Sequence, residues 1–360
     1  MTEKVYFVFH VTRIYYPLHS RLYCVFCHMA TISPIRFAFT LFRSTIPSVS
    51  QKSQKIDFAI GGQAVIEGVM MRSPSHYAVA VRKEDGRIKV CDSKYISITK
   101  RYKVLGIPVL RGLVHLFESM YIGVKALNIS NAEFMAGDAD HSPKKHSVWR
   151  ELMALIGSVL YFVFVFGLAI FLFKFLPLWL TQISSEKMTF LDNHFWAFNI
   201  LDGVIKTIFF LTYLLLISLI PDIKRVFAYH GAEHKSIWAY ELEKKLEPAE
   251  INKQTRFHPR CGTSFLLLVI FISIVIYTAI PTPDDFASKF LIRVAVLPLI
   301  AGVSYEALKF SAKHQSSWIV RAIVAPGLWF QKITTREPDD KQCEVAAKAL
   351  TRCLELEGKV

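Results

Sequence analysis

The residues His230-Gly-Ala-Glu233-His234 stand in a polar stretch, residues 222–263, that separates two long apolar runs of the chain. In a helix, His230 and His234 lie one turn apart on one face, and Glu233 lies beside them. The flanking apolar runs are long enough to cross a bilayer. The sequence therefore predicts a membrane protein built around a polar, helical insert.

The spacing His-x-x-Glu-His is that of the inverted zincin motif, in which two imidazoles bind a metal and the carboxylate is the general base for the metal-bound water. With 12 His among 360 residues, chance would place such a pattern in the chain about 0.02 times. The alternative is an ordinary solvated helix, in which Glu233 forms an ion pair with Lys235 or Lys224. We favour a bound divalent metal, with zinc as the expected ion.

A second cluster, His258-Pro-Arg-Cys261, stands where the insert returns to the membrane. Four protein ligands would close a tetrahedral, structural site, whereas three ligands and a water would leave it open for chemistry. For an open site, Glu306 near the end of the fourth span, or His258, is the expected third ligand. Cys261 beside Arg260 is either a ligand or nucleophile with thiolate character or a buried inert thiol. The closed alternative would use His230, His234, His258 and Cys261.

The composition indicates a mixed membrane protein. With 52% hydrophobic residues the chain is too apolar for a soluble domain of this size, and with 20% charged residues it is not entirely embedded. No stretch is typical of a nucleic-acid-binding module, so the net charge of +14 predicts a cationic side facing a membrane and no nucleic-acid partner. The six cysteines are scattered and predict no disulfide framework.

About four transmembrane helices are expected, over residues 152–173, 203–220, 263–280 and 291–308. The second contains Lys206, which is expected to snorkel at its outer end. The fourth is interrupted by Arg293, Pro298 and Glu306. Polar residues are expected to collect at one membrane face rather than along the spans, which disfavours a transporter.

Loop charge predicts the orientation of these spans. The loops opposite the insert, residues 181–200 and 281–290, hold one lysine each. By the positive-inside rule, the insert and both termini are therefore cytoplasmic. The insert carries eight basic residues, which are Lys224, Arg225, Lys235, Lys244, Lys245, Lys253, Arg256 and Arg260.

Residues 57–135 are predicted to form a β-rich cytoplasmic unit plus a surface helix. Alternating residues surround Glu84-Asp85-Gly86, a good hairpin turn. Glu67 is a solvated strand residue or a site carboxylate. The helix, residues 108–128, is expected to begin at Pro108 and to lie along the membrane surface or on the β unit. Its apolar stripe is formed by Val109, Leu113, Leu116, Phe117 and Met120.

The remaining segments flank these parts. Residues 1–56 contain one acidic residue and are predicted to be a leader, a transit-type segment or a mis-started extension. Their Cys24-x-x-Cys27-His28 has the haem-attachment spacing, which the predicted cytoplasmic location disfavours. Residues 136–150 are a polar linker to the four-span domain, residues 151–310. Residues 311–360 are predicted to supply an interfacial segment and a soluble, amphipathic C-terminal cytoplasmic helix.

Five separated motifs occur in order, at residues 61–72, 229–235, 258–264, 326–329 and 334–339. Over about residues 57–356 they resemble the YqhQ-type bacterial membrane proteins, a family of unknown function catalogued among predicted metal-dependent enzymes. The resemblance implies a multi-pass protein of the bacterial cytoplasmic (inner) membrane, and it implies no substrate. Glu67, Arg260 and Arg336 lie in these motifs and are further site candidates.

The leading hypothesis is a metal-dependent hydrolase at the cytoplasmic membrane face. His230 and His234 would be ligands, and Glu233 would be the general base. The alternative is a non-enzymatic scaffold or regulatory protein with a structural His/Cys metal site, and a transporter is third. The expected partners are the lipid bilayer and a membrane-protein or lipid-linked substrate.

Overall fold

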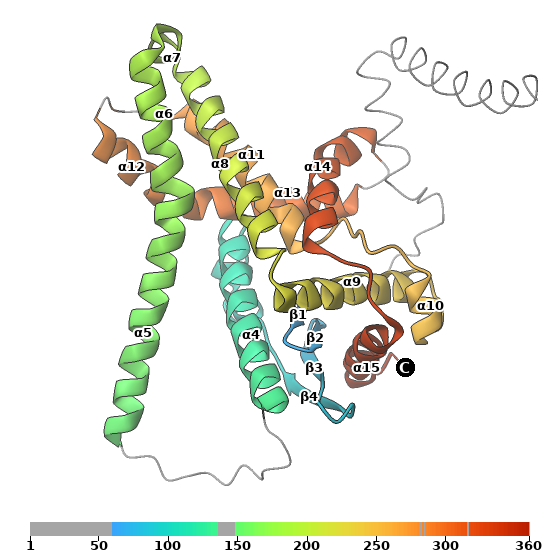
Figure 1. The fold of residues 1–360 in the computed structure, drawn as a ribbon. Coiled ribbons are helices and arrows are strands. Elements are labelled where there is room, and N and C mark those ends of the chain that lie inside the picture. The colour runs from blue at the N-terminus through green and yellow to red at the C-terminus, as the bar shows by residue number, and fades with distance from the viewer. Residues whose placement is uncertain (1–59, 136–147, 281–282, 284, 315–316, 360) are drawn as a thin grey trace, which may run out of the picture. The chain divides into compact units, whose positions relative to one another are not determined.

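The computed structural model describes residues 60–135, 148–280, 283, 285–314 and 317–359 (Figure 1). The predicted leader, its Cys24-to-His28 motif and most of the predicted linker lie outside the described residues. The described chain is mostly helical, with three or four helices apolar enough to cross a membrane and one small antiparallel sheet. In this coarse form the predicted fold class is confirmed.

The N-terminal β unit is a four-stranded antiparallel sheet in which each strand pairs with the next along the chain. Its strands are β1 (Gly61–Val65), β2 (Gly68–Arg72), β3 (His76–Arg82) and β4 (Ile88–Lys94). The predicted turn joins β3 to β4, and Gly86 there has a φ of 85°, which glycine adopts without steric cost. The short helices α3 (Ile98–Arg101) and η1 (Lys103–Gly106) follow the sheet.

The sheet is buried on both faces, because successive side chains of a strand alternate between two helical layers. On one face Met70 and Val79 pack with Ile122 of α4 (Leu110–Met135). The other face shares a core with α9 (Pro221–Glu241), α10 (Pro248–Asn252) and α15 (Asp340–Leu356). The C-terminal helix therefore completes the core of the N-terminal sheet, and Leu350 and Leu354 are fully buried there.

The predicted surface helix packs on the β unit, which was one of its two expected placements, and it starts two residues later than expected. Helix α4 begins at Leu110, and Phe117 and Met120 of the predicted stripe are exposed. The helix approaches its neighbour through small residues instead, since a Cβ atom at Gly112 would lie 2.8 Å from the Cβ of Tyr305. Close packing by glycine leaves the large apolar side chains of α4 facing outward.

The candidate spans form a bundle above α9 in Figure 1. Three helical stretches are by themselves long and apolar enough to cross a membrane, namely Val159–Lys187, Phe195–Ile217 and Gly262–Ala279. The helices Phe286–Ala295 and Leu297–Lys313, bent by 43°, are long and apolar enough as a pair. The predicted first span ends too early, because the helix continues through a π-helical turn, η2, that contains Lys174. The elements are α5 (Val148–Ile170), η2 (Phe171–Phe175), α6 (Leu176–Lys187), α7 (Thr189–Asn193), α8 (Phe195–Ile217), α11 (Gly262–Ala279), α12 (Phe286–Ala295) and α13 (Leu297–Lys313).

Lys206 does not snorkel, and this prediction was wrong. Its side chain is 5% exposed and pairs with Asp202, one turn earlier on α8. Asp202 also pairs with Arg293 of α12, and Arg293 donates to the Asn199 side-chain oxygen at 2.6 Å. A buried ionic network therefore joins two candidate spans, so polar residues are not confined to one end of the bundle.

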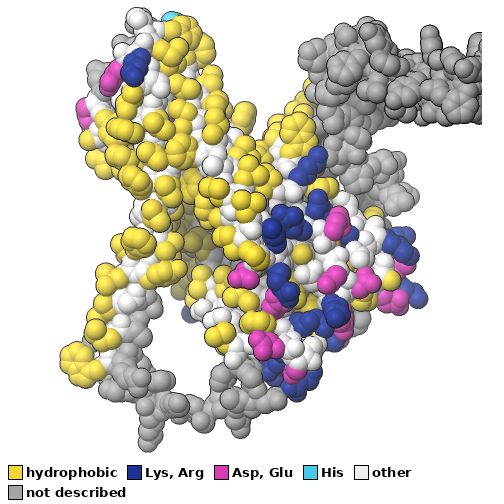
Figure 2. Space-filling view, viewed as in Figure 1, with side chains coloured by type: hydrophobic (Ala, Val, Ile, Leu, Met, Phe, Trp, Pro, Cys, Tyr) yellow, Lys and Arg dark blue, Asp and Glu magenta, His cyan; other side chains and the backbone are white. Residues whose placement is uncertain are grey.

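The last helices return the chain to α9. Helix α14 (Trp318–Thr334) packs on α11 and is not among the candidate spans. Helix α15 starts with a capping box between Asp339 and Gln342, as its predicted Asp-rich start favours. Figure 2 shows hydrophobic side chains over the bundle and Lys, Arg, Asp and Glu gathered over the part that contains α9, α10 and α15.

Candidate metal centre

Helix α9 carries both histidines of the motif and is held against the C-terminal segment at Gly231. A Cβ atom at residue 231 would lie 2.1 Å from the carbonyl oxygen of Arg336, so only glycine permits this crossing. The backbone N–H of Arg336 donates to the carbonyl of Phe227 at 2.8 Å. The glycine inside the His-Gly-Ala-Glu-His motif thus brings the segment after α14 onto α9.

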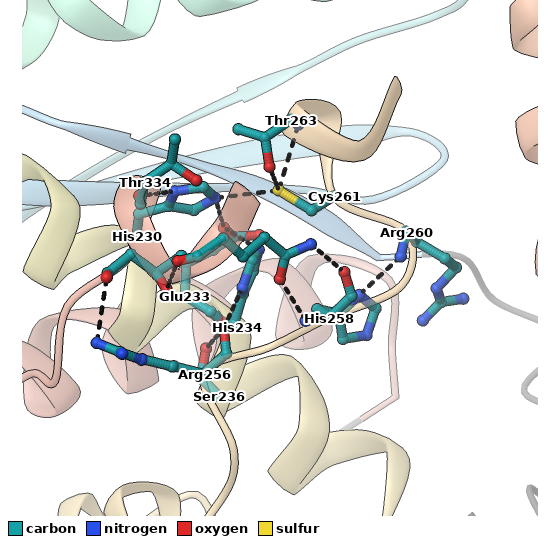
Figure 3. A network of polar contacts seen from close by, with 12 residues as sticks. His230, Glu233, His234, Ser236, Arg256, His258, Arg260, Cys261, Thr263 and Thr334 are labelled. Atoms are coloured by element: carbon teal, nitrogen blue, oxygen red, sulfur yellow. Dashed lines mark hydrogen bonds and ion pairs between the residues drawn. The ribbon is translucent and has the colours of Figure 1, made fainter. Parts of the chain in front are cut away.

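Two backbone carbonyls orient the two imidazoles. Nδ1 of His230 donates to the carbonyl of Thr334 at 2.8 Å, and Nδ1 of His234 donates to the carbonyl of Arg256 at 2.6 Å (Figure 3). These bonds assign the tautomer, because a ring nitrogen that donates leaves the other nitrogen with its lone pair. Both Nε2 atoms are therefore available as ligands, and the ring centroids are 4.4 Å apart.

Cys261 supplies a third ligand atom from the N-cap of α11. Its Sγ lies 3.3 Å from Nε2 of His230 and accepts from the backbone N–H of Thr263 at 3.5 Å. One ligand atom from each of His230, His234 and Cys261 lies within 4.8 Å of the others. In a tetrahedral zinc site with Zn–N and Zn–S bonds, ligand atoms lie roughly 3.3 to 3.8 Å apart, so a small contraction would fit this set to the ion.

Glu233 lies beside these atoms without being one of the converging group. Its Oε2 is 3.8 Å from Nε2 of both His230 and His234, and the side chain is almost completely buried. The carboxylate rests on β1, since a Cβ atom at Gly62 would lie 2.6 Å from the Glu233 Cγ. The alternative partner Lys235 is instead bound by Asn252 and, at 2.7 Å, by Glu337.

The electrostatics favour an anionic sulfur. Burial raises the pKa of the Cys261 thiol, but His230 and His234 outweigh it and hold the pKa well below its usual value. For His230, burial lowers the pKa, but the neighbouring sulfur and Glu233 outweigh burial and raise the pKa to about 9. Thiolate is the form in which cysteine binds metals, whereas His230 holds an extra proton that a metal ion would have to displace before Nε2 could bind it.

His258 lies next to this group and does not point into it. Gln331 binds both its backbone N–H and its carbonyl at 2.8 Å, which closes the loop before α11. Its Nε2 is buried without a hydrogen-bond partner, 3.6 Å from a carboxylate oxygen of Glu241. Burial, together with His234, lowers the pKa of His258 to about 3, so the ring is neutral. This geometry favours Cys261 over His258 as the third ligand.

The other predicted candidates hold the surrounding elements together. Glu306 forms a bidentate ion pair with Arg111 of α4 and is not among the converging residues. Glu67, in the β1–β2 turn, binds Arg225 of α9 at 2.5 Å. Arg260 pairs with Glu241, and the Arg336 side chain donates to the carbonyl of Ser218 at 3.4 Å. Glu306 is thus replaced by Cys261 in the ligand set that the geometry favours.

Sequence reasoning missed the groups that orient the site. These are the carbonyls of Thr334 and Arg256 and the backbone of Gly62. Gly62 and Thr334 lie in the motifs at residues 61–72 and 334–339. The neighbouring glycines of the first motif and threonines of the second were the available signal. A backbone carbonyl that accepts a hydrogen bond from a histidine cannot be recognised from the sequence, because every residue has a backbone carbonyl.

Comparisons with known proteins agree with the motifs. The family model described as "Protein of unknown function (DUF1385)" matches residues 107–356, which include all three converging side chains. "Uncharacterized protein YqhQ" of Bacillus subtilis (strain 168) is 34% identical over 310 residues, covering 84% of this chain and 95% of that protein. No solved structure matches. The chain therefore belongs to the YqhQ-type, DUF1385 family of proteins of unknown function.

Proposed function

We propose that the protein is a membrane-bound, metal-dependent hydrolase whose metal is held by His230, His234 and Cys261. The observation that carries the proposal is the convergence of these three ligand atoms with a separate carboxylate, Glu233, 3.8 Å from both imidazoles. Three protein ligands leave one tetrahedral position for water, which is the pattern of catalytic zinc sites.

The roles of the side chains follow from this arrangement. A divalent metal supplies a Lewis acid and lowers the pKa of a water at the open position. Glu233 accepts the proton of that water and later returns it to the leaving group. The carbonyls behind His230 and His234 hold the rings in one tautomer, and Gly62 leaves room for the carboxylate.

Replacement of Glu233 by Gln separates this proposal from its alternative. The amide keeps the shape of the side chain but cannot accept a proton, so zinc should stay bound while hydrolysis falls about 100- to 10,000-fold. The measurement uses proteoliposomes of bacterial lipid extract, with zinc content and hydrolysis products followed by elemental analysis and mass spectrometry. Glu247→Gln, at an exposed position of the same insert, is the control and should change neither quantity.

The alternative is a scaffold in which Glu233 closes the metal site as a fourth ligand. Its equal distance from both Nε2 atoms and its burial favour this reading. In that case Glu233→Gln should weaken zinc binding. A Glu233→Gln protein that keeps zinc and wild-type turnover would end the hydrolase proposal.

We further propose that the insert and both termini face the cytoplasm of a bacterial inner membrane. The eight basic residues of the insert oppose its translocation, and they lie on the part of the molecule where charges gather in Figure 2. A cysteine placed at Glu247 should resist an impermeant maleimide in intact cells and react after permeabilisation. Equal labelling in both states would reverse the orientation.

A further inference from the structure

A second concave site lies on the opposite side of β1 from the Glu233 carboxylate. It is a cavity of about 550 Å³ between the sheet, α3, α4 and α13, which is the size of a small-molecule site. Gly62 lines it, and the same glycine supports Glu233. Ile60, Met70, Ile122 and Tyr305 give the cavity an apolar part.

The polar part of the cavity suits an anion. Three basic side chains, Arg72, Lys100 and His115, line it together with four serine and threonine side chains. No Asp or Glu is among its described lining residues. The hydroxyls belong to Ser73, Ser97, Thr99 and Ser119. Arginine and hydroxyl donors are the groups that bind phosphate oxygens.

Arg72 is held in place from behind. Its guanidinium stacks 4.4 Å from the centre of the Tyr95 ring and donates to the Ser119 hydroxyl at 3.0 Å. Glu118 lies 3.8 Å away, and this buried carboxylate also accepts from the backbone N–H of Ile98 at 2.6 Å and from Ser97 and His115, each at 3.0 Å, so those two side chains are already engaged. The Glu118 carboxylate is thus bound by groups of the protein itself. The Lys100 ammonium makes no ion pair with any described residue.

The chain beside the cavity is suited to a membrane surface. The segment 98–107 exposes Ile98, Tyr102, Val104 and Ile107, and Val104 is 74% exposed. Exposed cations Lys100, Arg101 and Lys103 alternate with them. Apolar side chains next to cations are typical of segments that lie in the headgroup region.

We propose that this cavity binds the phosphate headgroup of an anionic phospholipid, with Arg72 and Lys100 as the charged contacts. The apolar part receives the start of the acyl chains, and the segment 98–107 lies in the bilayer surface beside it. Gly62 both lines the cavity and packs against Glu233, so the cavity adjoins the candidate metal centre. The further role of this lipid as the substrate rests on the proposed hydrolase function.

Calorimetric titration of the purified full chain in detergent tests the proposal. Dioctanoyl phosphatidic acid should bind at least 10-fold more tightly than dioctanoyl phosphatidylcholine, whose headgroup carries no net charge. Lys100→Gln and Arg72→Gln should each weaken phosphatidic acid binding about 10-fold or more, as expected for a charge-assisted hydrogen bond. Arg101→Gln is the matched control, since this neighbouring cation does not line the cavity.

The outcomes separate the possible ligands. Lys100→Gln is the decisive variant, because Lys100 is exposed and its loss leaves the fold intact, whereas Arg72 also supports Tyr95. Equal binding of both lipids, or no effect of Lys100→Gln, overturns the proposal. Inorganic phosphate that binds as tightly as phosphatidic acid overturns the assignment to a lipid.

A second comparison keeps the lipid site distinct from the metal centre. His230→Ala and Glu233→Gln should bind phosphatidic acid as the wild type does, because neither residue lines the cavity. Lipid binding without hydrolysis by the zinc-loaded wild type would contradict the role of this lipid as the substrate and leave the lipid site standing.

Discussion

Replacing Cys261 with alanine is expected to weaken zinc binding by more than roughly 100-fold, since loss of a group that only hydrogen-bonds to a ligand already costs about 10- to 100-fold. Cys261 is the one anionic ligand among the three converging side chains, and its sulfur is 3.3 Å from the His230 Nε2. Its removal leaves two neutral imidazoles, which hold a divalent ion poorly. Competition of the purified variant with a chelator of known affinity measures the effect.

Two control variants accompany this measurement. Cys343→Ala removes a buried free thiol on the core-facing side of α15 and should leave zinc affinity unchanged. His258→Ala should also keep the metal, because its Nε2 does not belong to the converging group, although the loop loses the bond from the Arg260 backbone N–H to His258 Nδ1. Loss of zinc in His258→Ala with retention in Cys261→Ala would reverse the assignment of the third ligand.

Replacing Asp202 with asparagine is expected to destabilise the bundle by about 3–5 kcal/mol, the range for breaking a buried ion pair by removing one partner. Asp202 is 1% exposed and pairs with both Lys206 and Arg293. Among the described residues, Asp202 is the only acidic side chain that pairs with Lys206 and Arg293, so its loss leaves both cations without an opposite charge. Thermal unfolding in detergent should show a lower midpoint.

Asp285→Asn is the matched control for this substitution. Asp285 is exposed and caps α12 by accepting from the Ser288 N–H at 2.8 Å. Asparagine is an equally good N-cap, so the midpoint should change little. Equal destabilisation by both variants would show that the buried network does not hold α8 to α12.

The local patterns of the sequence predict the elements well. Period-2 alternation and a Gly86 turn indicate the β3–β4 hairpin, and an uncharged run of apolar residues indicates α11, whose bounds differ by one residue at each end. The C-terminal helix starts at its predicted Asp-rich cap. These features depend on residues close together in the chain, which is why pattern alone finds them.

The parts that sequence could not predict depend on contacts between distant segments. The sequence left open whether α4 lies along the membrane surface or on the β unit, and in the structure Gly112 lets its backbone approach Tyr305 while Phe117 stays outside. Lys206 was expected at the membrane edge, but it shares its partner Asp202 with Arg293, which lies on another span. The pairing of β2 and β3 with α15, nearly 300 residues later, has no local signal at all.

The candidate metal site divides in the same way. Two imidazoles one turn apart and a neighbouring carboxylate are a helical pattern, so His230, Glu233 and His234 were readable as a group. The third ligand could not be chosen from the sequence, because the side chains of Cys261, His258 and Glu306 can all bind a divalent metal. Only the tertiary fold places the Cys261 sulfur beside His230 and turns Glu306 toward Arg111.

The most direct test of the metal site is elemental analysis of the wild-type protein, purified without chelator and then loaded with cobalt in place of its native ion. We expect about one divalent metal per chain and, with cobalt, the near-ultraviolet charge-transfer band of a thiolate bound to the metal. The band should be absent from Cys261→Ala. A wild-type protein that holds no stoichiometric metal after incubation with zinc, and shows no thiolate band with cobalt, would contradict the account.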